Sequence, residues 1–241
     1  MKLIVLTAAV FKTEAEAMRK LWVFRESCKK FDIPWCGYGT GREFPGYRMM
    51  KLEWQLEWLK NYKSLSVSGG ATHVLYTDSW DAFFVRDLWQ IQYQYDLMGR
   101  PDILSSAFYQ LGNVSDEETR YPGVFNHDVR YCYPNCGGYI AEIPVVIAAF
   151  ECMLTLSRQT NDDCFNWYDA YAEGWFKPQL DSECRIFQIG DEDVEVVGDR
   201  IHNRYTDSWP CVWHLSGGYT DPETGKDRVL VPYAKRLGII T

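Results

Sequence analysis

The chain has 241 residues, of which 46% are hydrophobic and 16% aromatic, a composition that excludes a disordered protein and allows one large domain. The formal net charge of −8 argues against a protein that wraps nucleic acid through a broad basic face, and leaves room only for a local basic patch. The longest apolar runs, residues 3–11 and 140–154, are too short to span a bilayer, so we expect no membrane partner.

Segments of strand and helix character alternate along the chain. Residues 2–10 are apolar and β-branched and predict a first core strand rather than a signal peptide. Residues 14–31 and 48–64 carry apolar side chains at helical spacing. The remaining predictions are strands within 32–39, before Asp78 and at 102–107, and a strand followed by a helix over 137–156.

This alternation predicts an α/β protein, a three-layer α/β/α domain with a mainly parallel, Rossmann-like central sheet. No linker or repeat divides the chain, so we expect a single domain over residues 1–241. Residues 221–241 are more charged and form a C-terminal extension to which the sequence assigns no role. The oligomeric state also stays open.

Eight cysteines are scattered along the chain, often inside apolar runs. This distribution is typical of small buried hydrophobic side chains in a reducing compartment rather than of a disulfide framework. We therefore expect a cytoplasmic protein, in the host cytoplasm if the chain is viral.

The segment "THVLYTDSWDAFF", residues 72–84, places Asp78 and Asp81 at the end of an apparently buried strand. A buried carboxylate is costly unless it is paired, hydrogen-bonded or bound to a metal. Ligands of parallel α/β sheets collect at the carboxyl ends of the strands, and hard carboxylate oxygens suit Mn²⁺ or Mg²⁺. The alternative is an aspartate that caps a turn or a helix.

Six segments, in order over roughly residues 2–220, resemble the glycosyltransferase domain of the collagen lysyl hydroxylases. They are "LIVLTAAVFKTEAEAMRK", "YTDSWDAFF" (family T-D-S-[YW]-D), "RYCYPNCGGYIAEIP" (N-[SA]-G-G-[FY]-I-G), "NDDCFNWY" (D-D-Q-x-F-Y), "LDSECRIFQ" (L-D-x-x-C-x-I-F-Q) and "WPCVWHLSGG" (P-x-x-x-H-G-N-G). Cys164 stands where glutamine is usual, and Leu215-Ser216 replaces Gly-Asn. The resemblance implies a GT-A-like fold.

The resemblance also implies three protein ligands for Mn²⁺ (or Mg²⁺), namely Asp78, Asp81 and His214. Without it, His214 would be interpreted as a core or turn histidine. The metal would then be the counter-charge of the two aspartates, shared with a nucleotide diphosphate.

Residues that would bind the donor follow from the same resemblance. Thr7 would face the uracil, Trp80 would flank the nucleotide, and Lys51 would reach a phosphate. The alternatives are a core aromatic for Trp80 and an exposed helical lysine for Lys51.

Two further segments belong to the implied donor site. In "NCGG", Asn135, Gly137 and Gly138 would line the donor-sugar pocket, because glycines permit close approach of a sugar; the alternative is an ordinary turn. Ser216 and Gly217 would bind the pyrophosphate, although the change from Gly-Asn to Leu-Ser alters that contact.

Asp162 and Asp163 are the candidates for catalysis on the acceptor, since a carboxylate can activate a hydroxyl or hold sugar hydroxyls. Either could instead cap a helix. Asp181 is a further candidate for this role.

The predicted activity is metal-dependent transfer of a hexose from a UDP-sugar to a hydroxyl of a macromolecule. The acceptors considered are a hydroxymethylated pyrimidine in DNA, as in viral or phage DNA modification, and a hydroxylysine-type protein side chain, with another glycan less favoured. The alternative is a non-catalytic nucleotide-sugar-binding or lectin-like module. A metal-dependent phosphohydrolase would need more carboxylates near Asp78.

Overall fold

The computed structural model describes residues 1–42, 50–65, 70–109, 121, 123–156, 163–215 and 230–241. The strands are β1 (Leu3–Ala8), β2 (Trp35–Tyr38), β3 (His73–Thr77), β4 (Ala82–Phe84), β5 (Ile103–Phe108), β6 (Tyr133–Glu142), β7 (Gln179–Leu180), β8 (Phe187–Ile189), β9 (Val194–Val197), β10 (Arg200–Asn203) and β11 (Val212–His214). The helices are α1 (Glu14–Lys20), α2 (Trp22–Lys30), α3 (Met50–Leu65), α4 (Leu88–Leu97), α6 (Ile143–Leu156), α7 (Asp163–Ala172) and α8 (Leu230–Arg236). Among these helices, none has the length and hydropathy needed to cross a membrane.

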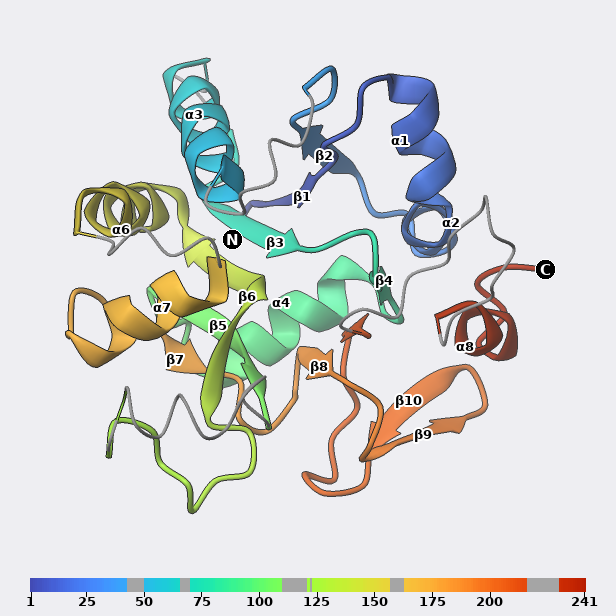
Figure 1. Ribbon diagram of the computed structural model, residues 1–241. Coiled ribbons are helices and arrows are strands. Elements are labelled where there is room, and N and C mark those ends of the chain that lie inside the picture. Colours follow the sequence, from blue (N-terminus) through green and yellow to red (C-terminus); the bar gives the residue numbers. More distant parts are fainter. Residues whose placement is uncertain (43–49, 66–69, 110–120, 122, 157–162, 216–229) are drawn as a thin grey trace.

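The central sheet has six strands in the order β2-β1-β3-β6-β5-β7 (Figure 1). The pairs β1–β2, β1–β3 and β5–β7 are parallel, and β6 alone runs antiparallel to its two neighbours. The mainly parallel sheet expected from the alternation of strands and helices is therefore confirmed.

Helices cover both faces of this sheet. Consecutive strand residues point to opposite sides, so the apolar residues of β1 and β3 present an apolar surface on each face. Val5 and Leu75 pack with α2 and α4, whereas Leu6 and Tyr76 pack with α3, α6 and α7. The predicted three-layer α/β/α arrangement is therefore present (Figure 1). A buried apolar cluster lies on each side of the sheet.

A second, three-stranded sheet has the order β4-β11-β8. In it β11 runs antiparallel to β4 and parallel to β8, and His214 is paired with Ala82. The backbone N–H of Leu215 also donates to the carbonyl of Asp81 at 2.8 Å. Residues about 130 positions apart in sequence thereby become neighbours at one end of this sheet.

The helix expected over residues 14–31 is in fact two helices, α1 and α2, which meet at Leu21. Leu21 has φ −95° and ψ 20°, outside the helical region, and its side chain is 1% exposed. It packs with Ala9, Phe11 and Ala17, so burial of this side chain accompanies the break in a segment that is otherwise helical.

The end of the chain packs on the rest of the fold. Tyr233 of α8 lies 4.5 Å, between ring centroids, from Trp213 of β11, and the α8 residues share a buried cluster with Val23 and Phe83. Lys30 Nζ donates to the Leu237 carbonyl at 2.7 Å. Residues 230–241, the described part of the extension to which the sequence assigned no role, therefore pack against β4 and β11.

Candidate metal centre and donor site

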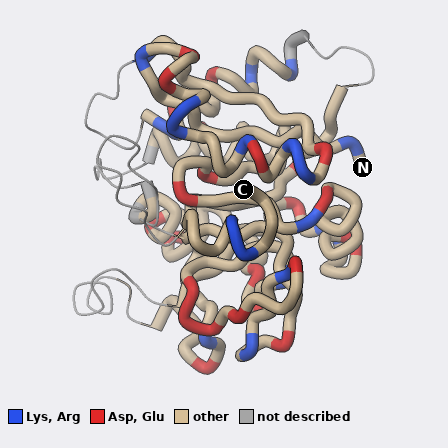
Figure 2. Tube along the Cα trace, turned by 90° about the vertical axis from the view of Figure 1, so that its right-hand side faces the viewer, with Lys and Arg blue, Asp and Glu red and all other residues tan. Residues whose placement is uncertain are grey.

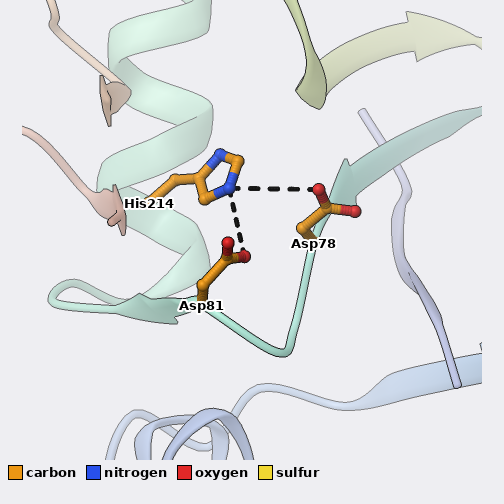
Figure 3. A group of neighbouring side chains, drawn as sticks. All are labelled: Asp78, Asp81 and His214. Atoms are coloured by element: carbon orange, nitrogen blue, oxygen red, sulfur yellow. Dashed lines mark ion pairs between the residues drawn. The ribbon is translucent and has the colours of Figure 1, made fainter. Parts of the chain in front are cut away.

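Three chain segments bring Asp78, Asp81 and His214 together (Figure 3). Asp78 follows the last residue of β3, Asp81 precedes the first residue of β4, and His214 ends β11. His214 Nε2 lies 3.1 Å from Asp81 Oδ1 and 3.9 Å from Asp78 Oδ2. One ligand atom from each residue fits within 4.8 Å of the others, so a single ion could contact all three.

Hydrogen bonds to main-chain carbonyls hold the turn that carries the two aspartates. The Asp78 N–H donates to the Gly137 carbonyl at 2.9 Å, which ties the end of β3 to β6. Between the aspartates, Ser79 Oγ donates to the Ala8 carbonyl at 3.1 Å, which ties the turn to β1. The carboxylates are therefore presented by a turn that is anchored on both sides.

Two basic side chains, those of Lys51 and His214, lie against the carboxylates. Lys51, from the first turn of α3, places Nζ 3.4 Å from Asp78 Oδ1, with its side chain only 26% exposed. This placement rules out the alternative of an exposed helical lysine. Burial by itself lowers the pKa of His214, but the carboxylates of Asp81 and Asp78 outweigh burial and raise it above its ordinary value. The Lys51 ammonium therefore lies beside the Asp78 carboxylate, and the His214 ring beside that of Asp81.

The donor set fits a divalent cation. Two carboxylates with one imidazole suit Mn²⁺ well, since imidazole binds transition ions and carboxylates bind hard cations. A Cβ built on Gly137 would lie 2.3 Å from His214 Cε1 and 2.6 Å from Nδ1, so the ring occupies space that only glycine leaves. Within the described part of the chain, the buried Nδ1 has no hydrogen-bond partner.

The "NCGG" segment is an irregularity in β6 rather than a simple turn. On β5, Ser105 pairs with Tyr139 and the next residue, Ser106, pairs with Asn135, so residues 136–138 have no partner on β5. Such bulges occur beside functional sites because they redirect the backbone. Here the bulge brings Gly137 against His214.

The sequence profile of the PLOD GT domain matches residues 1–220 of this chain. The chain belongs to the PLOD GT domain family. It is accordingly a glycosyltransferase domain, and the resemblance drawn from six short segments is confirmed. The match ends before α8, which is therefore an element outside the matched region.

A crystal structure of a glycosyltransferase involved in the glycosylation of the major capsid of PBCV-1 has a similar fold. The two chains superpose with a TM-score of 0.53 over 100% of each chain at 10% sequence identity, which is a likeness of fold alone. A comparison with curated proteins finds no match.

Several residues that the PLOD GT resemblance assigned to donor binding lie near the triad. Trp80 occupies the turn between Asp78 and Asp81 and is 41% exposed, so it is not a core aromatic. Its ring lies 5.6 Å from that of Phe11, between centroids. Thr7, at the penultimate position of β1, is fully buried, and its Oγ1 has no hydrogen-bond partner among the described residues.

Asn135 and Gly138 have structural roles beside the site. Asn135 Oδ1 accepts from the Gly137 N–H at 2.9 Å, which holds the bulge in place. A Cβ on Gly138 would meet Phe187 at 2.9 Å, so this glycine faces the core whereas Gly137 faces the triad. Asn135 therefore positions Gly137, and direct contact of Gly138 with the donor sugar stays a prediction.

Other predicted site residues lie at the limits of the structure. Asp162, Ser216 and Gly217 lie outside the described residues. Asp163 is the first residue of α7, and this helix packs on β6, the strand that contains the "NCGG" bulge. The acceptor role of the two adjacent aspartates accordingly stays a prediction.

Asp181 is not available for catalysis. Its carboxylate is fully buried and accepts from three backbone N–H groups, those of Arg185 (2.9 Å), Ile186 (2.8 Å) and Phe187 (2.7 Å). The further candidate from the sequence therefore has a structural role, because it organises the turn that leads into β8.

Replacement of Asp181 by alanine is expected to lower the free energy of unfolding by about 3 kcal/mol or more, because three buried N–H donors lose their acceptor. Urea denaturation would measure the loss. Glu183→Ala is the matched control, since that carboxylate is 63% exposed and pairs with Arg185 at the surface. Equal stability of the two variants would contradict the structural role.

Tyr76 is a site residue that the sequence analysis missed. Its hydroxyl donates to Asp78 Oδ1 at 2.7 Å. Burial, and then the Asp78 carboxylate, raise the pKa of Tyr76 well above its ordinary value, so the hydroxyl remains a donor. Residues 76 and 78 are two positions apart at the end of a strand, so their side chains point to the same face of the sheet. This spacing is the sequence signal from which the contact could have been predicted.

Tyr76→Phe is expected to weaken Mn²⁺ binding by about 10- to 100-fold, since partners that orient a ligating carboxylate typically contribute that much. Titration calorimetry would measure the affinity. Tyr139→Phe is the control, because it also removes a buried tyrosine hydroxyl, one that accepts from Gln55 instead of contacting Asp78. An equal loss in both variants would point to a general packing effect.

Proposed function

We propose that this PLOD GT domain transfers a hexose from a UDP-sugar to a hydroxyl of a macromolecular acceptor and depends on Mn²⁺ or Mg²⁺. The observation that carries the proposal is the convergence of Asp78, Asp81 and His214 from three separate strand ends. A binding module without turnover has no need of such a set, which is why transfer is preferred over a lectin-like function.

Asp78, Asp81 and His214 would hold the cation, which would act as a Lewis acid toward the departing diphosphate. Lys51 is already within 3.4 Å of Asp78, so a diphosphate at this centre would lie near its ammonium group. A point positive charge there would stabilise the negative charge that develops on the leaving group.

The remaining groups would position the two substrates. The buried hydroxyl of Thr7, which has no partner among the described residues, would satisfy a polar edge of uracil. The 41% exposed Trp80 would flank the nucleotide. On the acceptor side, Asp163 at the start of α7, or its neighbour Asp162, would position or deprotonate the attacking hydroxyl.

Charge favours a protein hydroxyl over duplex DNA as the acceptor. The net charge is −8, and on the side that Figure 2 presents, Lys and Arg are interspersed with Asp and Glu. Duplex DNA binding normally relies on several lysines and arginines that neutralise successive phosphates.

A cytoplasmic location and action of residues 1–241 as one domain belong to the same proposal.

The proposal is tested by thermal unfolding with UDP, with Mn²⁺, and with both, followed by a panel of UDP-sugars. A ligand at 100 times its dissociation constant adds about 2.7 kcal/mol, which raises the melting temperature of a chain of this size by about 5–10 °C. We expect this shift only when UDP and Mn²⁺ are both present. No shift with any nucleotide would leave a non-catalytic relative of the family as the better description.

A further inference from the structure

Two cysteines from different elements meet beside the candidate site. Cys136 lies in the β6 bulge and Cys164 is the second residue of α7, and their Sγ atoms are 2.8 Å apart. A disulfide bond is about 2.05 Å long, so the two sulfurs are within about 1 Å of bonding distance. In the structure both are thiols.

The surroundings hold this pair together. Helix α7 packs on β6, and Trp167 of α7 lies 5.6 Å, between ring centroids, from Tyr139 of β6. Cys136 is further fixed by its neighbours, because Asn135 Oδ1 accepts from the Gly137 N–H. The distance between the two thiols is therefore set by the packing of α7 on β6, because a cysteine side chain is short and follows its backbone.

These two cysteines differ from the buried ones of the chain. Both are of intermediate burial, so a small disulfide reagent can reach them. Cys28, in contrast, is 2% exposed, and burial raises the pKa of its thiol to about 12, which makes it a poor nucleophile. Both members of the pair also stand where the family patterns quoted above have another residue, Ser or Ala for Cys136 and Gln for Cys164.

We propose that Cys136 and Cys164 form a reversible disulfide that fixes the first turn of α7 against the β6 bulge. The bond would tether Asp163, the residue before Cys164, to the strand that carries Gly137 and abuts His214. The consequence for turnover rests on the proposed function, whereas formation of the bond does not.

The oxidant is a low-molecular-weight disulfide such as glutathione disulfide. The thiolate of one cysteine attacks a glutathione sulfur, which forms a mixed disulfide and releases one glutathione. The second cysteine, after loss of its proton, attacks the protein sulfur of the mixed disulfide and releases the second glutathione. The two cysteine sulfurs lose two electrons, and two glutathione thiols take up the two protons.

The bond itself is tested without donor or metal. The protein is equilibrated with EDTA over a series of glutathione to glutathione-disulfide ratios, alkylated, digested and analysed by mass spectrometry. We expect a linked peptide pair containing Cys136 and Cys164, lighter by two hydrogens, and an apparent melting temperature about 6 °C or more above that of the reduced protein.

Cys164→Ser should abolish the linked pair and the melting shift. Cys152→Ser should keep both, because Cys152 is also of intermediate burial but lies in α6. The absence of the linked pair at every ratio overturns the proposal. Equal yields of links from Cys36 or Cys152 also overturn it, since they would mean unselective oxidation.

The effect on the site is measured as UDP release from the UDP-sugar that stabilises the protein most. A tether that preorganises the start of α7 should raise kcat at least about threefold in the oxidised protein and leave UDP affinity unchanged. Cys164→Ser should show no response to oxidation. An unchanged or lower kcat in the linked protein would overturn this consequence while the bond itself stands, and an absence of turnover in both redox forms would refute the proposed function instead.

Discussion

Asp81→Asn and His214→Gln are each expected to lower the affinity for Mn²⁺ by at least about 100-fold, since even the partners that orient a metal ligand contribute 10- to 100-fold. Each change replaces a ligand of the triad by a neutral amide of similar shape, so the surrounding packing should persist. With Mn²⁺ binding lost, UDP should no longer stabilise the protein at micromolar to millimolar Mn²⁺.

Titration calorimetry with Mn²⁺, followed by thermal unfolding with UDP and Mn²⁺, measures both effects. The matched control is Asp96→Asn, an exposed aspartate on α4 that pairs with Arg100. If UDP stabilised either triad variant with the same Mn²⁺ dependence as the wild type, the assignment of these residues as metal ligands would be contradicted. A variant that has lost secondary structure by circular dichroism would be replaced by Asp81→Glu, which keeps the charge but shifts the ligand atom.

Gly137→Ala is expected to have an effect on metal binding as large as removal of a ligand. Gly137 is not among the glycines at positive φ, so the alanine backbone is allowed and the added methyl alone matters. That methyl would lie 2.3 Å from His214 Cε1, a distance that real contacts do not reach. The imidazole must move, and Mn²⁺ affinity should fall by about 100-fold or more.

Gly138→Ala provides the comparison for this experiment. Its methyl would meet Phe187 at 2.9 Å and Ser106 Oγ at 3.2 Å, on the core side of β6. We expect overpacking to lower its free energy of unfolding by about 1–3 kcal/mol, with unchanged Mn²⁺ affinity in the folded protein. Loss of metal affinity in Gly138→Ala, or its retention in Gly137→Ala, would show that the bulge does not position His214.

A common physical cause links these expectations. Asp78 directly follows β3, Asp81 directly precedes β4 and His214 ends β11, and these strands belong to two different sheets. Backbone hydrogen bonds from the Asp78 N–H to Gly137 and from the Leu215 N–H to Asp81, together with the packing of β8 on β5, hold them in place relative to one another. Changes at Tyr76 or Gly137 should therefore act on metal affinity through the geometry of Asp78 or His214.

Local pattern in the sequence was sufficient for the main elements. Apolar and β-branched runs predicted strands at β1, β3 and β5, helical spacing predicted helix over α1, α2 and α3, and the order of strands and helices predicted the three layers. The strands β4 and β8–β11 were missed, because three or four residues carry too little periodicity. The helix α4 was missed because polar residues alternate with its apolar ones.

For the site, the sequence determined which residue types are present and, through six ordered segments, which family they resemble. Asp78 and Asp81 are near neighbours at the end of a predicted strand, so a shared metal site could be proposed for them, with a capping aspartate as the alternative. His214 could be added only through the resemblance, since no local rule connects residues so far apart.

Only the tertiary structure decided the contacts that depend on packing between elements. It brought the side chains of Lys51 and Tyr76 into contact with the Asp78 carboxylate. It packed Gly137 against the His214 ring and Cys136 against Cys164. It also showed that the Asp181 carboxylate accepts hydrogen bonds from backbone N–H groups, which gives it a structural role. Periodicity specifies which face of a strand or helix is buried. The distance between two buried side chains depends on sheet order, register and bulges, which long-range pairing sets and no short segment encodes.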